Sequence, residues 1–323
     1  MAEHESGNAE LLLNPDMDVH RAWMRDNKSM KLVDKVMSEA EAVRRFVKEG
    51  DFLATELYGS VRAPMGICRE IVRQGFKDLR FAGQGVMETE CLIAGGCVTA
   101  TEMCYQGWEV FGISHVLRRA AEGGTLKISE WSNAALAWRL KAAAMGLSFI
   151  PSRSMLGTDT FNYSGAKTIT CPFTGQKYCA LPATMVDVGI IHAHRADRYG
   201  NVQVDGITGF AVELARASRR LIVSVEEIID TDEIRKAPDR TMIPWFLVDA
   251  VVPNPFGSWP GEMCYVHDRD GDHLKMYLEA TKTVEGTKAY FDEWVTGTES
   301  HQALLEKLGA DHLADLKSKA LGR

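Results

Sequence analysis

The sequence lacks the signatures of several large protein classes. No apolar run approaches the about 20 residues that a membrane-spanning helix needs. The first residues, MAEHESGNAE, have neither the basic start nor the apolar core of a signal peptide. The seven cysteines include no pair in the C-x-x-C spacing that is typical of zinc and dithiol sites. We therefore expect a cytoplasmic protein with reduced cysteines, no bound metal and no contact with a membrane.

The chain also has fewer basic than acidic residues. The 323 residues contain 37 Lys and Arg against 44 Asp and Glu, for a formal net charge of −7. Binding to nucleic acid requires a concentrated basic surface, so we expect no nucleic-acid partner. Hydrophobic residues make up 46% and charged residues 25% of the chain, which is ordinary for a folded globular protein.

Three nucleotide and hydrolase motifs are missing or incomplete. The chain has no G-x-x-x-x-G-K-[ST] phosphate loop and no G-x-S-x-G nucleophile elbow. Gly83 and Gly85 follow a short apolar run at 79–82, but the third glycine of a dinucleotide fingerprint is absent. Glu88 moreover stands where a pyrophosphate would lie. These features argue against a nicotinamide enzyme, a P-loop ATPase and an α/β-hydrolase.

The chain instead shows short apolar runs that alternate with amphipathic segments. This alternation predicts an α/β fold with an open, mostly parallel sheet flanked by helices, and ligands bind such sheets at the carboxyl ends of the strands. Ser38 begins a capping box, which predicts a helix start. Residues 1–30 are polar and aperiodic, and we interpret them as an N-terminal arm before one domain at 31–323. Strands are expected at 52–57, 79–82, 97–103, 185–193, 221–226 and 247–252, and helices at 65–74, 109–122, 131–145, 211–218 and 273–293.

Two pairs of polar residues lie within apolar runs. His192 and His194 alternate along one predicted strand, so both rings face the same side, as metal ligands require. No further ligand is near in sequence, and hydrogen-bonded imidazoles are the favoured interpretation. Asp187 and Asp249 interrupt or end apolar runs, which predicts buried acids that accept backbone N–H bonds, with catalysis as the less favoured role.

A longer pattern points to a family. The segment from Leu181 to Val202 contains a P-x(4)-D strand, an I-I-H-A stretch and a closing D-x-x-G-N turn. Two later blocks, at 224–235 and 243–260, follow in order, as does the C-terminal tail. Together they resemble the alpha subunits of class I coenzyme A transferases, especially those of the glutaconate type, over roughly residues 32–318.

The resemblance implies an α/β chain that joins a beta subunit in a heterodimer or an alpha2-beta2 heterotetramer, with the active site between the chains. In transferases of this kind a glutamate of the beta chain attacks the acyl-CoA thioester, which suits a carboxylate because it is both a nucleophile and a leaving group. The resemblance further implies an acyl-CoA thioester as substrate and no permanently bound cofactor.

The first strand departs from the family pattern. Transferase alpha chains have a glycine pair at its end, beside the bound thioester, and Glu56 and Leu57 stand there in this chain. Glu56 could reshape the acyl pocket or act as an acid or base; alternatively it is a solvated turn residue. The resemblance assigns coenzyme A binding to this turn and to the later glycine turn, that is, to Tyr58, Gly59, Ser60, Gly83 and Gly85.

A second departure resembles a sister branch, the alpha subunits of steroid ring-cleaving CoA hydrolases. Arg153 matches an arginine of that branch and, in a loop after an apolar run, could clamp a carboxylate or enolate oxygen through two N–H bonds. The catalytic glutamate of that branch falls on Asn133, which cannot act as a base, with Glu130 nearby in sequence. A surface position is the alternative for Arg153.

The sequence thus predicts the alpha subunit of a two-component CoA-transferase that moves CoA between an acyl-CoA, of a dicarboxylic or branched acid, and a free carboxylic acid. Candidate catalytic residues are Glu56, Glu130, Asn133 and Arg153. The alternatives are a CoA-thioester hydrolase that cleaves a ring C–C bond, a decarboxylase on the same fold, or a noncatalytic CoA-binding partner of a catalytic beta chain.

Overall fold

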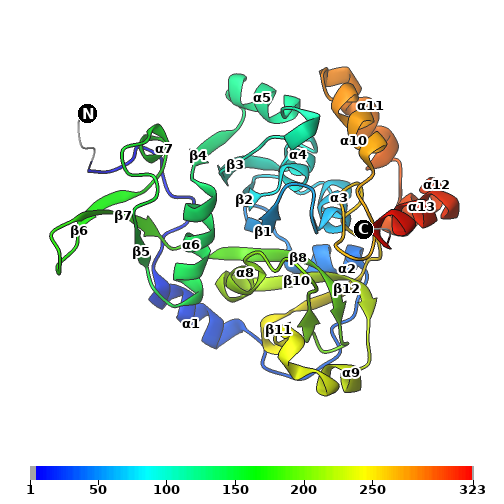
Figure 1. Ribbon diagram of the computed structural model, residues 1–323, viewed down its shortest axis with the longest axis horizontal. Helices are drawn as coiled ribbons and strands as arrows, with labels where there is room; N and C mark the ends of the chain where they lie inside the picture. Colours follow the sequence, from blue (N-terminus) through cyan, green and yellow to red (C-terminus); the bar gives the residue numbers. More distant parts are fainter. Residues whose placement is uncertain (1–4, 322–323) are drawn as a thin grey trace.

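Seven apolar segments form a parallel sheet at the centre of the molecule (Figure 1). The computed structural model describes residues 5–321, apart from the side chains of Leu57, Tyr58 and Leu321. Neighbouring strands run parallel in the order β4-β3-β2-β1-β8-β10-β12. Their bounds are β1 (Phe52–Tyr58), β2 (Leu79–Gln84), β3 (Val98–Met103), β4 (Lys127–Glu130), β8 (Val186–Ala196), β10 (Ser218–Ile228) and β12 (Ala250–Pro253). The mostly parallel α/β sheet predicted from the sequence is confirmed.

Helices cover both faces of this sheet because successive side chains of each strand point to opposite sides. Leu53 packs into a core formed with one group of helices: α2 (Glu39–Phe46), α3 (Met65–Arg73), α4 (Val86–Ala94), α5 (His115–Glu122), α10 (Gly271–Ala280) and α11 (Val284–Trp294). Phe52 and Ala54 pack into a second core with α1 (Met17–Asn27), α6 (Asn133–Ala144) and α8 (Ala211–Ala217). The result is three layers, with the sheet in the middle.

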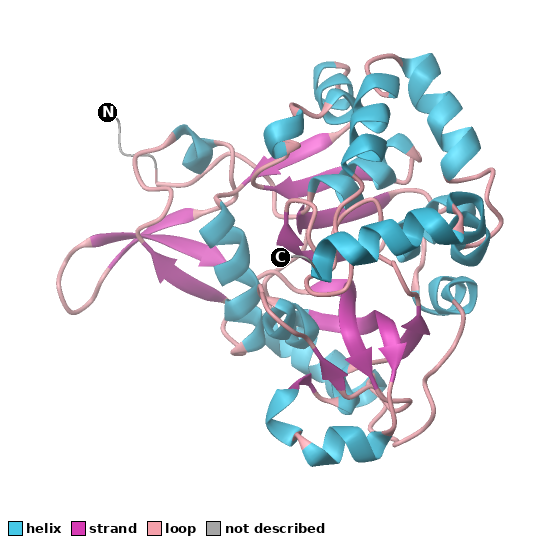
Figure 2. Ribbon diagram, turned by 45° about the vertical axis from the view of Figure 1, so that its right-hand side comes forward, coloured by secondary structure: helices cyan, strands magenta, loops and turns pink. Residues whose placement is uncertain are grey.

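A small antiparallel sheet projects from this body (Figure 2). Its strands are β5 (Phe149–Ser152), β6 (Lys167–Thr170) and β7 (Lys177–Pro182), in the order β5-β7-β6, and α7 (Asp159–Asn162) precedes β6. The sequence did not predict this sheet, because its strands are short and expose much of their length to solvent.

The remaining elements lie at the edges. Strands β9 (Val202–Gln203) and β11 (Thr241–Ile243) add an antiparallel edge beyond β8. The C-terminal helices α12 (His301–Leu308) and α13 (Ala310–Leu321) enclose a small core with Phe256 and Trp259. The other short helices are α9 (Thr231–Lys236), η1 (Glu109–Phe111), η2 (Pro238–Arg240) and η3 (Trp245–Leu247).

Local signals in the sequence account for several helix ends. The hydroxyl of Ser38 accepts the N–H of Glu41 at 3.2 Å and so caps α2, as predicted. The predicted helix at 109–122 is wrong in its first part, because Gly112 has a φ of +123° and the α-helix begins only after Ser114. The predicted helix at 273–293 is divided into α10 and α11, which Thr283 caps.

The expected arm at 1–30 contains α1, which packs against the body. Lys28 Nζ lies 2.5 Å from Asp249 Oδ2, and Arg80 donates to the carbonyl oxygen of Leu12. No helix within residues 5–321 is long and apolar enough to cross a membrane.

Candidate active site

The carboxyl ends of β1, β2, β3 and β4 lie along one edge of the sheet because these strands are parallel neighbours. The residues that follow these ends are the turn 59–63, the start of α4, the loop 104–114 and the start of α6. Ligands of open parallel sheets bind at this edge. Most of the predicted site residues fall here.

Glu56, at the end of β1, forms a buried ion pair. Its Oε1 lies 2.6 Å from Nη2 of Arg62, and the two side chains are 1% and 0% exposed. Burial raises the pKa of Glu56, and the Arg62 guanidinium offsets part of that rise. Arg62 also donates from Nη1 to the carbonyl oxygen of His192 at 3.0 Å, which fixes the pair to β8. Glu56 is therefore not the solvated turn residue of the alternative interpretation.

The predicted coenzyme A turn at 59–60 has a constrained geometry. Gly59 has a φ of +69°, and a Cβ at this position would lie 2.5 Å from Oε1 of Glu109. The carbonyl oxygen of Ser60 accepts the N–H of Glu262 at 2.8 Å, while the Ser60 hydroxyl is buried and has no hydrogen-bond partner among the described residues. Both residues line a small cavity of about 10 Å³ next to Trp108. The side chain of Tyr58 lies outside the described residues.

The glycine turn after β2 is already filled by the protein. The carboxylate of Glu88, in the first turn of α4, lies over Gly85, so that a Cβ on Gly85 would be 2.1 Å from Glu88 Oε2. Gly83 is packed against Thr55 and Phe81. A phosphate would meet the Glu88 carboxyl at this helix start, which agrees with the absence of a dinucleotide fingerprint.

Glu88 is the second buried acid of this edge. Burial raises the pKa of Glu88 to about 7, because desolvation outweighs the hydrogen bonds from its own backbone N–H and from Thr55, and the Glu56 carboxylate adds to the rise. The sequence identified Glu88 only as an obstacle to pyrophosphate. A carboxyl that takes up a proton near neutral pH is a property of functional sites.

Hydrogen bonds connect the ends of β2 and β4 to the loop after β5. Gln84 Nε2 donates to the carbonyl oxygen of Asn133 at 2.7 Å. The Ser132 hydroxyl caps α6 and lies 2.7 Å from the hydroxyl of Ser154. Arg153 is thereby held beside the start of α6.

The remaining predicted catalytic residues lie at the surface. Glu130, Asn133 and Arg153 are all exposed. Arg153 has no hydrogen-bond or ion-pair partner among residues 5–321. The structure thus places two kinds of group near the same strand ends: a buried layer of acids and an exposed polar layer.

The two histidines of β8 are structural. His192 lies 2.9 Å from the Ser224 hydroxyl through Nδ1 and 2.9 Å from Glu226 Oε1 through Nε2. Burial opposes ionisation of Glu226, but hydrogen bonds from His192 and His267 outweigh it and hold the pKa of that carboxyl well below its usual value. His194 donates from Nε2 to the carbonyl oxygen of Cys264 at 2.8 Å. The predicted hydrogen-bonded imidazoles are confirmed, and the described residues contain no cluster of ligands able to hold a metal ion.

Asp187 and Asp249 cap backbone groups, as predicted. Asp187 accepts the N–H of Phe52 at 3.0 Å, and Asp249 accepts the N–H of Leu221 at 2.8 Å. Both acids also pair with basic side chains, Arg219 and Lys28. Their bonds tie strands β1 and β10 to their neighbours.

Comparison with known proteins identifies the family. The sequence profile of coenzyme A transferases matches residues 36–254. The chain is 35% identical over 304 residues to the alpha subunit of glutaconate CoA-transferase from Acidaminococcus fermentans, covering 88% of this chain and 95% of that one. It is 34% identical over 279 residues to the alpha subunit of 3-oxoadipate CoA-transferase from Pseudomonas knackmussii, covering 85% and 98%. The chain belongs to the coenzyme A transferase family.

Within that family the similarity to glutaconate CoA-transferase extends to the structure. The crystal structure of the A. fermentans enzyme matches with a TM-score of 0.85 at 34% identity, over 88% of this chain and 95% of that chain. The decarboxylase AibA/AibB matches with a TM-score of 0.71 at 30% identity, over 80% and 99%. The cholesterol ring-cleaving hydrolase IpdA subunit of Rhodococcus jostii is 26% identical over 293 residues, covering 86% of this chain and 98% of that one. The sequence-based recognition of the family is confirmed.

Proposed function

We propose that this chain is the alpha subunit of a cytoplasmic two-component CoA-transferase, which moves CoA between an acyl-CoA of a dicarboxylic or branched acid and a free carboxylic acid. The single observation that carries the proposal is the exposed polar layer at the carboxyl ends of the sheet. Glu130, Asn133 and Arg153 lie there above a buried acid layer without being covered by the chain itself. Such an exposed polar layer suits one half of an active site that a second chain completes.

Apolar side chains beside this layer support a partner subunit. The loop 104–114, which leaves the end of β3, exposes Tyr105, Val110 and Ile113 by 45%, 87% and 55%. Single exposed apolar residues are common, but several in one loop at a ligand-binding edge are typical of an interface. We propose that a beta subunit covers this loop and completes the site. Residues 31–323 would form the alpha-subunit domain and residues 1–30 an arm docked on it.

The chemistry follows from that arrangement. A glutamate carboxylate of the beta chain attacks the thioester carbonyl, and the C–S bond of the tetrahedral adduct breaks, which leaves an acyl-glutamyl anhydride and a CoA thiolate. The thiolate then attacks the anhydride at the glutamyl carbonyl, which releases the acyl group as a carboxylate and leaves a glutamyl-CoA thioester. The acceptor carboxylate attacks this thioester, and the same steps in reverse form the new acyl-CoA and regenerate the glutamate. Arg153 is suited to hold the carboxylate of the acyl group or the acceptor through two parallel N–H bonds. The Glu56–Arg62 pair positions the turn at Gly59 and Ser60, against which the CoA chain would lie.

A second reaction is favoured by the similarity to the AibA/AibB decarboxylase and to the ring-cleaving hydrolase subunit. The exposed Arg153 suits that reaction equally, because a guanidinium stabilises an enolate oxygen as well as a carboxylate. Under this alternative the acyl-CoA would be hydrolysed or decarboxylated, and no CoA would pass to a second acid.

One experiment separates the two reactions. The chain and its beta partner would be co-purified and incubated with glutaryl-CoA, with and without acetate as free-acid acceptor. Transfer predicts loss of glutaryl-CoA and formation of acetyl-CoA only when acetate is present. Loss of glutaryl-CoA at the same rate without acetate would favour hydrolysis or decarboxylation and contradict the proposal.

A further inference from the structure

Arg69, in the middle of α3, is a buried cation that has no anionic partner in the described part of the chain. The residue is 3% exposed, and its Nη1 donates to the carbonyl oxygen of Trp259 at 2.9 Å. Its Nε and Nη2 have no hydrogen-bond partner, and no carboxylate among residues 5–321 forms an ion pair with it. Desolvation lowers the pKa of Arg69 to about 10, so the guanidinium remains charged at neutral pH. A buried charge of this kind is ordinarily paired.

The two unpartnered groups lie on one edge of the guanidinium. Nε–H and Nη2–H form the fork through which arginine binds an anion side-on. Elsewhere in this chain Arg25 uses the same fork to bind Asp26, at 2.7 Å and 2.9 Å. At Arg69 both donors of the fork are free.

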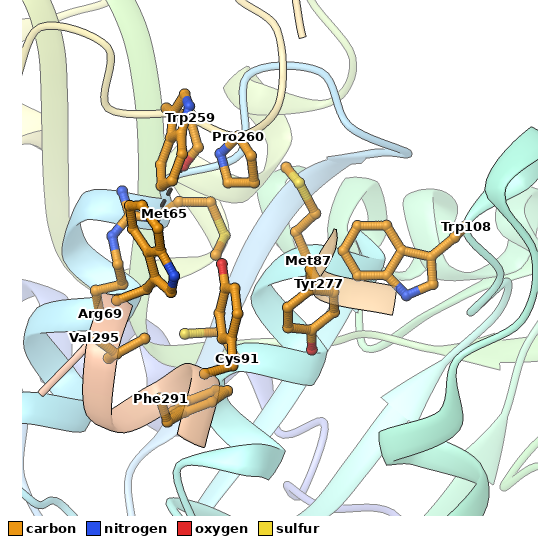
Figure 3. A pocket seen from close by; sticks show the side chains of 12 residues that line it. Met65, Arg69, Met87, Cys91, Trp108, Trp259, Pro260, Tyr277, Phe291 and Val295 are labelled. Carbon is orange, nitrogen blue, oxygen red and sulfur yellow. Dashed lines mark hydrogen bonds between the residues drawn. The ribbon is translucent and has the colours of Figure 1, made fainter. Parts of the chain in front are cut away.

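A cavity of about 30 Å³ adjoins Arg69 (Figure 3). Its other lining side chains are apolar or aromatic and come from α3, α4, α10, α11 and the loops at 108 and 259–260: Met65, Met87, Cys91, Trp108, Trp259, Pro260, Tyr277, Tyr290, Phe291, Trp294 and Val295. Burial raises the pKa of Cys91 to about 12 and raises that of Tyr290, so both groups are neutral. Arg69 is therefore the one charged group of the described lining.

We propose that this cavity binds a monovalent halide ion, chloride under ordinary conditions, beside the guanidinium of Arg69. A cavity needs roughly 10–15 Å³ to hold a water molecule, so about 30 Å³ accommodates an ion of the size of chloride. Aromatic rings present positive edges, and such a lining favours a weakly hydrated, polarisable anion over a strongly hydrated one. The cavity shares Trp108 with the small cavity at Gly59 and Ser60, but the proposed halide site does not depend on the proposed function.

The bound ion would stabilise the contact between α3 and α11. Arg69 reaches across from α3 to the Trp259 carbonyl oxygen, and Trp294 and Val295 enclose the cavity from the end of α11. Neutralising Arg69 therefore stabilises the packing of the C-terminal helices on the parallel sheet.

The test is the melting temperature of the full chain, measured during titration with sodium bromide or sodium chloride into sodium gluconate at constant ionic strength. The proposal predicts a saturable rise in melting temperature, with bromide at least as effective as chloride. Arg69→Met should abolish the rise. Arg118→Met is the matched control, since Arg118 is 61% exposed and its loss removes one positive charge without altering the cavity. The proposal would be overturned if the melting temperature of the wild type did not depend on halide, or if it rose equally in Arg69→Met.

A second variant and a direct measurement test the proposal even if Arg69→Met does not fold. Val295→Ile keeps the guanidinium but fills part of the cavity, so the halide concentration at half-effect should rise at least tenfold. Crystals soaked in bromide should show an anomalous peak in the cavity beside the Arg69 guanidinium. An unchanged halide midpoint in Val295→Ile, or ordered water without an anomalous peak, would show that water fills the cavity.

Discussion

Glu88 should make the stability of the protein fall as pH rises through neutrality. The carboxyl is fully buried at the start of α4, and burial raises its pKa from 4.5 to about 7. At pH values between these two pKa values, Glu88 carries a proton in the folded state but has lost it in the unfolded state. The free energy of unfolding therefore decreases with rising pH over this interval, and the stabilisation is fully present only below about pH 4.5.

The size of the effect follows from the same two values. Each unit of pKa difference is worth about 1.4 kcal/mol, so Glu88 contributes about 2.5 kcal/mol more stability at about pH 5 than at about pH 8. Glu88→Gln keeps the shape of the side chain and removes the titration. The wild type should thus lose about 2.5 kcal/mol more than Glu88→Gln between these two pH values. Neighbouring groups such as Glu56 and Arg62 are present in both proteins, so their contributions largely cancel in the comparison.

The assay is urea unfolding of the full chain at several pH values between about 5 and 8, with extrapolation to zero urea. Glu285→Gln is the matched control, because Glu285 occupies the first turn of α11 but is exposed. This control should show the pH dependence of the wild type. Parallel curves for the wild type and Glu88→Gln would refute the assignment of a proton to Glu88.

Three further predictions concern the site. Glu56→Gln leaves the buried Arg62 without its partner and should lower the free energy of unfolding in urea by about 3–5 kcal/mol. The double variant with Arg62→Met should recover part of that loss, whereas independent, additive effects of the two substitutions would contradict the ion pair. Arg153→Lys in the assembled complex should lower kcat/KM by roughly 30-fold or more, with an unaltered melting temperature because the side chain is exposed; a change below about threefold would rule out the clamp. Gly59→Ala and Gly124→Ala both place a Cβ at positive φ, and each should lower the free energy of unfolding in urea by about 1 kcal/mol. The KM for acyl-CoA should rise only for Gly59→Ala, because only there does the new Cβ displace the side chain of Glu109. Equal KM values in the two variants would show that this turn does not contact the substrate.

The sequence predicts the central layer well because its strands are buried on both faces. Such strands appear as short continuous apolar runs, and the runs at 52–57 and 79–82 correspond to β1 and β2. The acids that interrupt these runs are also predictable. Asp187 and Asp249 have no way to be buried except by accepting hydrogen bonds, and they accept backbone N–H groups in the structure.

The buried ion pairs are not predictable from local pattern. Arg62 follows Glu56 by six residues but reaches it only because its backbone has a φ of +51°, which no periodicity indicates. Arg139 binds Glu102 through two bonds of 2.7 Å and 3.0 Å across a separation of 37 residues. Family resemblance accordingly placed the candidate residues at these strand ends, whereas the charge pairing around them emerged only from the fold.

Transfer of CoA to a free acid can be measured directly with an isotope label on the acceptor. The chain, its beta partner and their complex would each be incubated with unlabelled acyl-CoA and a ¹³C-labelled carboxylic acid, and the CoA thioesters analysed by mass spectrometry. If this chain is the alpha subunit of a CoA-transferase, a labelled CoA thioester should form only with the complex. Disappearance of the acyl-CoA without any labelled thioester, or full turnover by this chain alone, would contradict that assignment.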